Sequence, residues 1–179
     1  MKHFVGLFLA LMMCLSIACI PASASEIEGP VHEIMVIDNG YARERTAPSS
    51  FYNLGGNNYY TGELIDLAAT RGSYTLYYFA TGTGNIYVKM NLERSGTTTG
   101  RERELQVKLY EKNSASATGA LVSTKIISFD TAEATRRAVF SGLDVNKFYY
   151  IYFYNSSSDS SCSSLDISGQ ITIDDSYIS

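Results

Sequence analysis

The sequence predicts an all-β domain: an antiparallel β-sandwich with a jelly-roll-like arrangement of about eight or nine strands. Two observations favour this fold class. Short runs of β-branched and aromatic residues recur between turns rich in Gly, Asn and Ser, and no segment after residue 24 has the apolar periodicity of an amphipathic helix. Turn signals mark where strands end but do not reveal which strands pair, so an up-and-down barrel is the alternative.

The first half of the chain contains strand patterns between strong turn signals. Residues 31–37 form a run that ends at Asp38-Asn39-Gly40. Residues 41–58 are rich in turn residues and predict a long connection with at most a short extended piece, at 51–54. Further strands are expected at 59–67, 73–79 and 85–93, and the last of these alternates clearly, with Ile86, Val88, Met90 and Leu92 on one face.

The second half is built around residues 147–155, which read Lys-Phe-Tyr-Tyr-Ile-Tyr-Phe-Tyr-Asn and predict a central strand. Before this strand, residues 130–134 are expected to form one helical turn. A serine-rich loop follows it at residues 156–164. The remaining strands are expected at 104–111, 121–129, 136–141 and 165–173.

The first 24 residues have the three-part pattern of a secretory signal peptide. Lys2 precedes an apolar run over residues 4–20, and Ala22 and Ala24 supply the small side chains of a cleavage site. We therefore expect residues 1–24 to be removed when a bacterial cell exports the protein, and residues 25–179 to form one extracellular domain.

Charge and hydropathy exclude some partners of the mature chain. Removing Lys2 leaves 13 Lys and Arg against 18 Asp and Glu, a net charge of −5, and no basic run exceeds Arg136-Arg137. Nucleic acid, which binds basic surfaces, is therefore not an expected partner. No second long apolar segment is present, so we expect no membrane span.

Cysteine usage raises one alternative localisation. Lipid attachment at Cys19 would anchor the protein, although Ser16 stands where the usual lipoprotein signal has a leucine-like residue. After cleavage at residue 24 the chain retains Cys162 alone, so we expect no internal disulfide and an exposed thiol in the serine-rich loop.

Tyrosine, with 14 residues, is the unusual component of the composition. Strand alternation separates Tyr149, Ile151 and Phe153 from the other row of the central strand. Because this row contains Ile and Phe, it is the expected core row, and the other row is left on the outer face. Such a row of aromatic rings is expected to be either a contact site or covered by another segment. The candidate binding residues are Tyr87, Tyr110, Tyr150, Tyr152 and Tyr154.

The last two strands carry a family resemblance. Phe140-Ser141-Gly142-Leu143, then Phe148-Tyr149-Tyr150-Ile151, and then Ile167-Ser168-Gly169-Gln170-Ile171-Thr172-Ile173 resemble the end of bacterial pre-peptidase C-terminal domains. The similarity covers about a fifth of the chain. It implies a small, jelly-roll-like accessory module, usually non-catalytic, that acts beside secreted enzymes.

Few residues offer catalytic or metal chemistry. The mature chain has one histidine, His32, which we interpret as an ordinary strand residue. A glycosidase would need two carboxylates on facing strands, and the candidates are Glu63, Asp66, Glu104 and Glu111. No other cofactor is expected, although calcium is possible at Asp38, Asp174 and Asp175, which offer hard oxygen ligands.

These observations lead to a ranked set of functions. The first is a secreted, non-catalytic β-sandwich that binds an extracellular glycan, a cell surface or a protein. The alternatives are a self-assembling extracellular or matrix protein, suggested by the uncharged aromatic strand, and a small carboxylate-dependent glycoside hydrolase.

Overall fold

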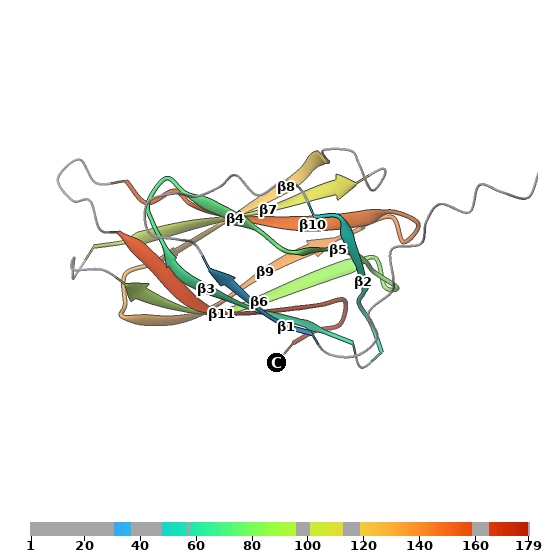
Figure 1. Cartoon of the computed structure of the whole chain (residues 1–179), viewed down its shortest axis with the longest axis horizontal. Coiled ribbons are helices and arrows are strands. Elements are labelled where there is room, and N and C mark those ends of the chain that lie inside the picture. Colours follow the sequence, from blue (N-terminus) through green and yellow to red (C-terminus); the bar gives the residue numbers. More distant parts are fainter. Residues whose placement is uncertain are drawn as a thin grey trace, which may run out of the picture.

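The computed structural model confirms the all-β sandwich. It describes residues 31–36, 48–56, 58–95, 101–112, 119–158 and 165–178, and within them eleven strands and no helix. The strands form two layers, seen edge-on in Figure 1. Their bounds are β1 Val31–Val36, β2 Ser50–Asn53, β3 Tyr60–Leu67, β4 Gly72–Tyr74, β5 Tyr77–Ala80, β6 Asn85–Ser95, β7 Arg103–Lys112, β8 Ala120–Phe129, β9 Glu133–Ser141, β10 Phe148–Asn155 and β11 Asp166–Asp174.

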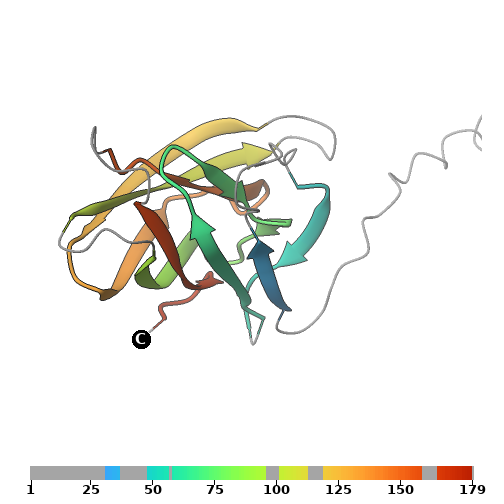
Figure 2. The same ribbon diagram turned by 60° about the vertical axis from the view of Figure 1, so that its left-hand side comes forward.

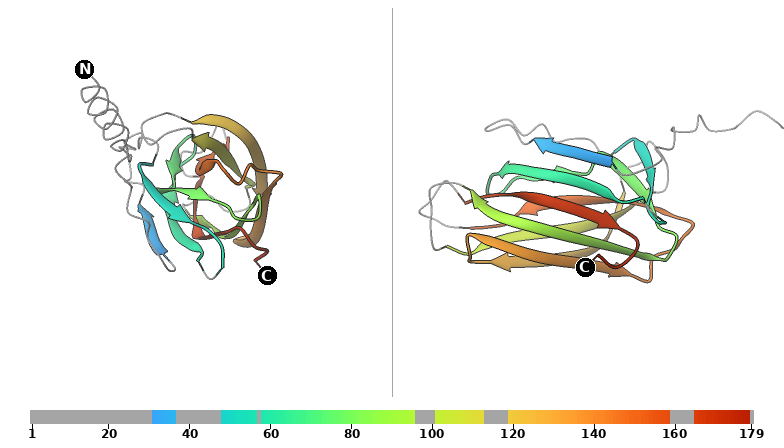
Figure 3. Two further views of the ribbon diagram at one scale, coloured as in Figure 1. Left: turned by 90° about the vertical axis from the view of Figure 1, so that its right-hand side faces the viewer. Right: turned by 90° about the horizontal axis from the view of Figure 1, so that it is seen from below.

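The two sheets have jelly-roll connectivity. Sheet A has the order β2-β5-β10-β7-β8, with β4 also paired to β10, and sheet B has the order β1-β3-β11-β6-β9. The early strand β3 lies beside the late strand β11, and β5 lies beside β10, as two nested Greek keys require. An up-and-down barrel would instead pair sequential neighbours. The right panel of Figure 3 shows sheet B from β1 (blue) to β9 (orange).

Two strand pairs depart from the expected antiparallel arrangement. β1 pairs with β3 in parallel, and β2 pairs with β5 in parallel. Both parallel strands come from the N-terminal part of the chain and lie on the same side of the sandwich (Figure 2). They add an edge strand to each sheet, and β2 at Ser50–Asn53 is the short extended piece expected at 51–54 within the connection.

The expected strand at residues 73–79 is broken into β4 and β5. Thr75 lies at the break, where its amide donates to the carbonyl of Ile151 at 2.9 Å. Its Oγ1 donates to the carbonyl of Tyr77 and accepts a hydrogen bond from the amide of Ile151, at 2.9 and 3.3 Å. The helical turn expected at residues 130–134 is wrong, because β9 already begins at Glu133 and a two-residue bend precedes it.

The core lies between the sheets and confirms the predicted inward rows. Side chains of both sheets interdigitate there, and β10 supplies Tyr149, Ile151 and Phe153, each at most 2% exposed. The other predicted rows are buried as well: Ile86, Val88, Met90 and Leu92 from β6, Leu105, Val107 and Leu109 from β7, and Leu165, Ile167, Ile171 and Ile173 from the last strand region.

Several expectations fall on residues that the structure leaves undescribed. The signal segment, Cys19, Asp38 and Cys162 lie outside the described residues, and they stay predictions. The backbone of His32 lies on β1, opposite Thr61 of β3. Within the described ranges, no helix has the length and apolar character needed to cross a membrane.

Candidate functional site

The outer face of sheet A carries a contiguous group of tyrosines from three neighbouring strands. In register, Tyr150 of β10 lies opposite Tyr110 of β7, and Tyr152 of β10 lies opposite Tyr74 of β4. Tyr154 follows two residues further along β10, on the same face. We call this group the tyrosine face: Tyr74, Tyr110, Tyr150, Tyr152 and Tyr154.

The rings of the tyrosine face form one packed array. The Tyr110 and Tyr150 rings stack at 5.2 Å with an interplanar angle of 3°, and Tyr74 touches both Tyr150 and Tyr152 at 5.7 and 4.4 Å. Tyr152 and Tyr154 lie 6.3 Å apart with their planes 24° from parallel. Such contacts stabilise each pair by about 0.5–1.5 kcal/mol beyond burial. The rings of the array therefore hold one another in defined orientations.

Tyr150 is the covered member of the tyrosine face. Its side chain is 1% exposed, and its hydroxyl accepts a hydrogen bond from the amide of Gly119 at 3.1 Å. Burial raises the pKa of the Tyr150 phenol above its ordinary value, because the phenolate would lose hydration. Tyr150 is thus a support beneath the surface, whereas Tyr74, Tyr110, Tyr152 and Tyr154 are half-buried and keep part of each side chain in solvent.

Two lysines of β7 lie among the aromatic rings. The Lys108 ammonium is 4.9 Å from the Tyr154 ring centroid and 6.0 Å from that of Tyr152. Lys112 is 2% exposed, donates to the carbonyl of Pro48 and lies 5.0 Å from the Tyr78 ring centroid. Burial lowers the pKa of Lys112. Lys108 is therefore the half-exposed cation at the tyrosine face, and Lys112 belongs to its buried margin.

A second aromatic group borders the tyrosine face at one end of β10. The Phe51, Tyr78 and Phe148 rings contact one another at centroid distances of 5.3 to 5.5 Å. Phe148 is 39% exposed, so this group also reaches solvent. Aromatic side chains consequently extend along the outer face of sheet A from β2 to β7.

Tyr87 does not belong to this site. It points outward as predicted, but β6 is part of sheet B, so Tyr87 lies on the opposite outer face of the sandwich and contacts Tyr177 at 6.0 Å. Strand alternation separates inward from outward residues, yet it carries no information about which sheet a strand joins. Tyr74, which sequence reasoning missed, takes its place; the signal that could have found it was its position in the aromatic run at residues 74–79.

The four candidate catalytic carboxylates are dispersed. Glu63 of β3 lies on the outer face of sheet B, whereas Glu104 of β7 lies on the outer face of sheet A and accepts a hydrogen bond from Ser156. Asp66 accepts a hydrogen bond from the Ser168 hydroxyl, and Glu111 pairs with Lys147 at 2.9 Å. No two of these four carboxylates therefore lie together as the acid–base pair that a glycosidase needs.

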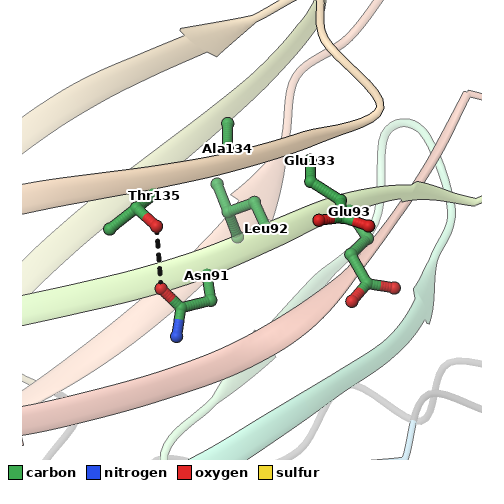
Figure 4. Close-up of a pocket in the computed structure, with 6 residues that line it drawn as sticks. All are labelled: Asn91, Leu92, Glu93, Glu133, Ala134 and Thr135. Carbon is green, nitrogen blue, oxygen red and sulfur yellow. Dashed lines mark hydrogen bonds between the residues drawn. The ribbon is translucent and has the colours of Figure 1, made fainter.

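A different carboxylate pair lines an open depression on sheet B. The depression has a volume of about 360 Å³ and is lined by Asn91, Leu92, Glu93, Glu133, Ala134 and Thr135 (Figure 4). Glu93 and Glu133 lie directly opposite each other in the ladder, and both are exposed. A general acid is kept protonated by burial, so this exposed pair does not have the environment of a glycosidase dyad.

The calcium candidates at the C-terminal end have internal partners. The Asp175 carboxylate is buried and accepts hydrogen bonds from the Gly82 amide and the Ser176 hydroxyl, at 2.9 and 3.2 Å. Asp174 accepts bonds from the amides of Asp175 and Ser176. Across the described ranges, no three residues of the types His, Cys, Asp and Glu group together as metal ligands.

Comparisons with known proteins find similarity at the level of solved structures. No family model matches the chain, and no curated protein matches it. A solved structure described as "Family 16 Carbohydrate Binding Module-2" is similar with a TM-score of 0.32 and 14% sequence identity, over 71% of this chain and 82% of that chain. The functional assignment therefore depends on the geometry of this chain itself.

Proposed function

We propose that this protein is a secreted, non-catalytic β-sandwich whose tyrosine face binds an extracellular glycan. The observation that supports the proposal is the array of half-exposed rings on β4, β7 and β10, with Tyr152 and Tyr154 6.3 Å apart and near-parallel. Aromatic rings that stay partly exposed side by side on one face generally have a use, because exposed apolar area is costly in water. Tyr74, Tyr110, Tyr152 and Tyr154 are half-buried and keep part of each side chain in solvent.

The chemistry of the face suits sugars. Tyrosine offers an apolar ring for the C–H faces of a pyranose and a hydroxyl for its oxygens. The rings are held by one another and by the sheet, so binding requires little ordering of the protein. A chain lying along β10 would meet Tyr152 and Tyr154, which are separated along the strand by about 7 Å, the spacing of alternate residues, while Tyr150 supports them from beneath.

Affinity electrophoresis in native gels that contain single polysaccharides tests the proposal. The mature protein should be retarded by at least one polymer of a panel of plant, fungal and bacterial glycans, and Tyr154→Ala should reduce the retardation at least fivefold. Tyr154 contacts Tyr152 and Lys108, so its removal should leave the fold intact. Thermal unfolding of each variant checks this.

Tyr87→Ala is the matched control. It removes a half-buried tyrosine that also touches one other ring, but from the outer face of sheet B. Its retardation should equal that of the unmodified protein. Equal losses for both variants, or no retardation by any polymer, would contradict the proposal.

A further inference from the structure

Lys108 occupies a distinctive place on the tyrosine face. In the ladder it lies opposite Tyr152, and its ammonium stays within 6.0 Å of two ring centroids, those of Tyr152 and Tyr154. Throughout the residues that the structure describes, its recorded contacts are these two rings, with no hydrogen bond or ion pair. Among the described residues, the charge is thus held at the rings of Tyr152 and Tyr154 without a carboxylate partner.

The surroundings of Lys108 contain no competing anion on the neighbouring strands. β4, β8 and β10 have no Asp or Glu at all. The two acids of β7 are engaged elsewhere: Glu104 accepts a hydrogen bond from Ser156, and Glu111 pairs with Lys147. Glu104 is also four residues from Lys108 along the strand, a separation of about 14 Å, beyond the screening length of physiological salt.

This local charge is opposite in sign to that of the whole chain, which has a net charge of −4. A protein with excess negative charge repels polyanions unless a local site attracts them. From the placement of Lys108 we infer that the ligand of the tyrosine face is an anionic glycan, whose carboxylate or sulfate group is bound by the Lys108 ammonium while its rings pack on Tyr152 and Tyr154. The inference rests on the proposed function and specifies its ligand class.

Pairs of polymers that share a backbone and differ in charge test the inference. Binding to polygalacturonate is compared with binding to its methyl ester, and binding to carboxymethylcellulose and cellulose sulfate is compared with binding to neutral hydroxyethylcellulose. The mature protein should bind at least one anionic member about fivefold or more tighter than its neutral counterpart, the factor that about 1 kcal/mol from one ion pair gives. The preference should fall as salt rises. A preference for the carboxylated or for the sulfated polymer identifies the anion.

Variants then connect the preference to Lys108. Lys108→Gln should bind charged and neutral polymers equally, and Lys108→Arg should retain the preference. Lys89→Gln, a half-buried lysine on the outer face of sheet B, should change nothing. Equal binding of neutral and anionic polymers, or a preference that survives Lys108→Gln, overturns the inference and leaves glycan binding standing. Absence of binding to every polymer overturns both.

Discussion

The ring of Tyr152 lies across the backbone of Gly72, so close that a Cβ atom at position 72 would overlap the Tyr152 hydroxyl and ring. Gly72 belongs to β4, and its register partner on β10 is Tyr154. The Tyr152 ring thus crosses diagonally from β10 to β4 and covers the space that Gly72 leaves because it has no side chain. This contact fixes the orientation of a central ring of the tyrosine face.

Gly72→Ala should therefore displace Tyr152. The ring must turn away from the added methyl group, which we expect to cost about 1–3 kcal/mol of stability, the range for overpacked sites, and to weaken glycan binding. The double variant Gly72→Ala, Tyr152→Ala should be more stable than the sum of the single changes predicts, because the collision is then absent. Urea denaturation of the four proteins measures the coupling.

Gly82→Ala is the control for this experiment. An added Cβ there would lie 3.4 Å from the Asp175 carboxylate, an ordinary contact, and it does not touch the tyrosine face. If the losses in unfolding free energy of Gly72→Ala and Tyr152→Ala simply add up in the double variant, the orientation of the Tyr152 ring does not depend on Gly72.

Asn155 is a second position where one side chain holds separate elements together. It is fully buried at the end of β10; its Nδ2 donates to the carbonyls of Leu67 and Leu165, each at 2.7 Å, and its Oδ1 accepts from the amide of Ser157. Asn155→Asp removes both donors and puts a carboxylate against two carbonyl oxygens. We expect a loss of about 2–5 kcal/mol in the free energy of unfolding.

The pH dependence of this variant has a definite sign. Burial beside two carbonyls should raise the pKa of the new carboxyl group, and the protonated form can donate one hydrogen bond, so the loss should shrink as pH falls toward 4. Asn53→Asp, at an exposed position of β2, should cost little at any pH. A cost for Asn155→Asp no larger than that for Asn53→Asp would contradict the assigned role of the side chain.

The inward rows of the core could be predicted because strand alternation is a local property. Ile86, Val88, Leu105 and Leu109 are buried as expected, and so are Tyr149, Ile151 and Phe153. The fold class followed from the same local evidence, namely short apolar strands, turn residues and no helical period. These features depend on the residue and its near neighbours alone.

The composition of the candidate site depends on pairing between distant strands and could be predicted only in part. Tyr87 and Tyr110 have the same outward parity, yet jelly-roll connectivity separates them onto opposite faces. The burial of Tyr150 depends on Tyr110 and Gly119, 40 and 31 residues earlier in the chain. No pattern around Lys108 shows that it lies opposite Tyr152, because that register is set by the whole sheet.

Asp174 should make stability fall as pH rises through its pKa. Burial is the main cause that raises the pKa of this carboxyl group above its ordinary value of 3.8, against the two amide hydrogen bonds that lower it. The folded state therefore holds the proton more tightly than the unfolded state, and the ionised form at neutral pH costs stability. Asp174→Asn keeps an acceptor for both amides and removes the charge.

We expect Asp174→Asn to raise the melting temperature at pH 7 and to lose this advantage as the pH falls below the ordinary value of 3.8, where the aspartate becomes protonated in the unfolded state as well as in the folded state. Asp130→Asn, which makes the same change at an exposed position, is the control for the substitution itself. A melting temperature that drops at pH 7 would instead indicate that the ionised carboxylate has a favourable partner, as calcium at Asp174 and Asp175 would provide. Adding calcium to the unmodified protein separates these cases.

The last prediction concerns self-association through the edge of sheet A. β8 is the outermost strand next to β7, and it exposes Leu121, Val122 and Ile126, with 45 to 59% of each residue accessible. It has no proline or glycine, so its free edge could pair with another strand. Lys125 is the one charge of β8; it lies opposite the buried Val107, and its ammonium is 6.0 Å from the ring of the core residue Phe140.

The Lys125 side chain is exposed, and a second strand that paired with the edge of β8 would desolvate its charge, which disfavours pairing. Lys125→Val should therefore produce concentration-dependent oligomers in sedimentation velocity, whereas the unmodified protein stays monomeric. Lys89→Val is the control, since β6 is paired on both sides and offers no free edge. Oligomers of the unmodified protein that pair through β8 would contradict the protective role of Lys125 and would favour the self-assembling alternative over a monomeric binding module.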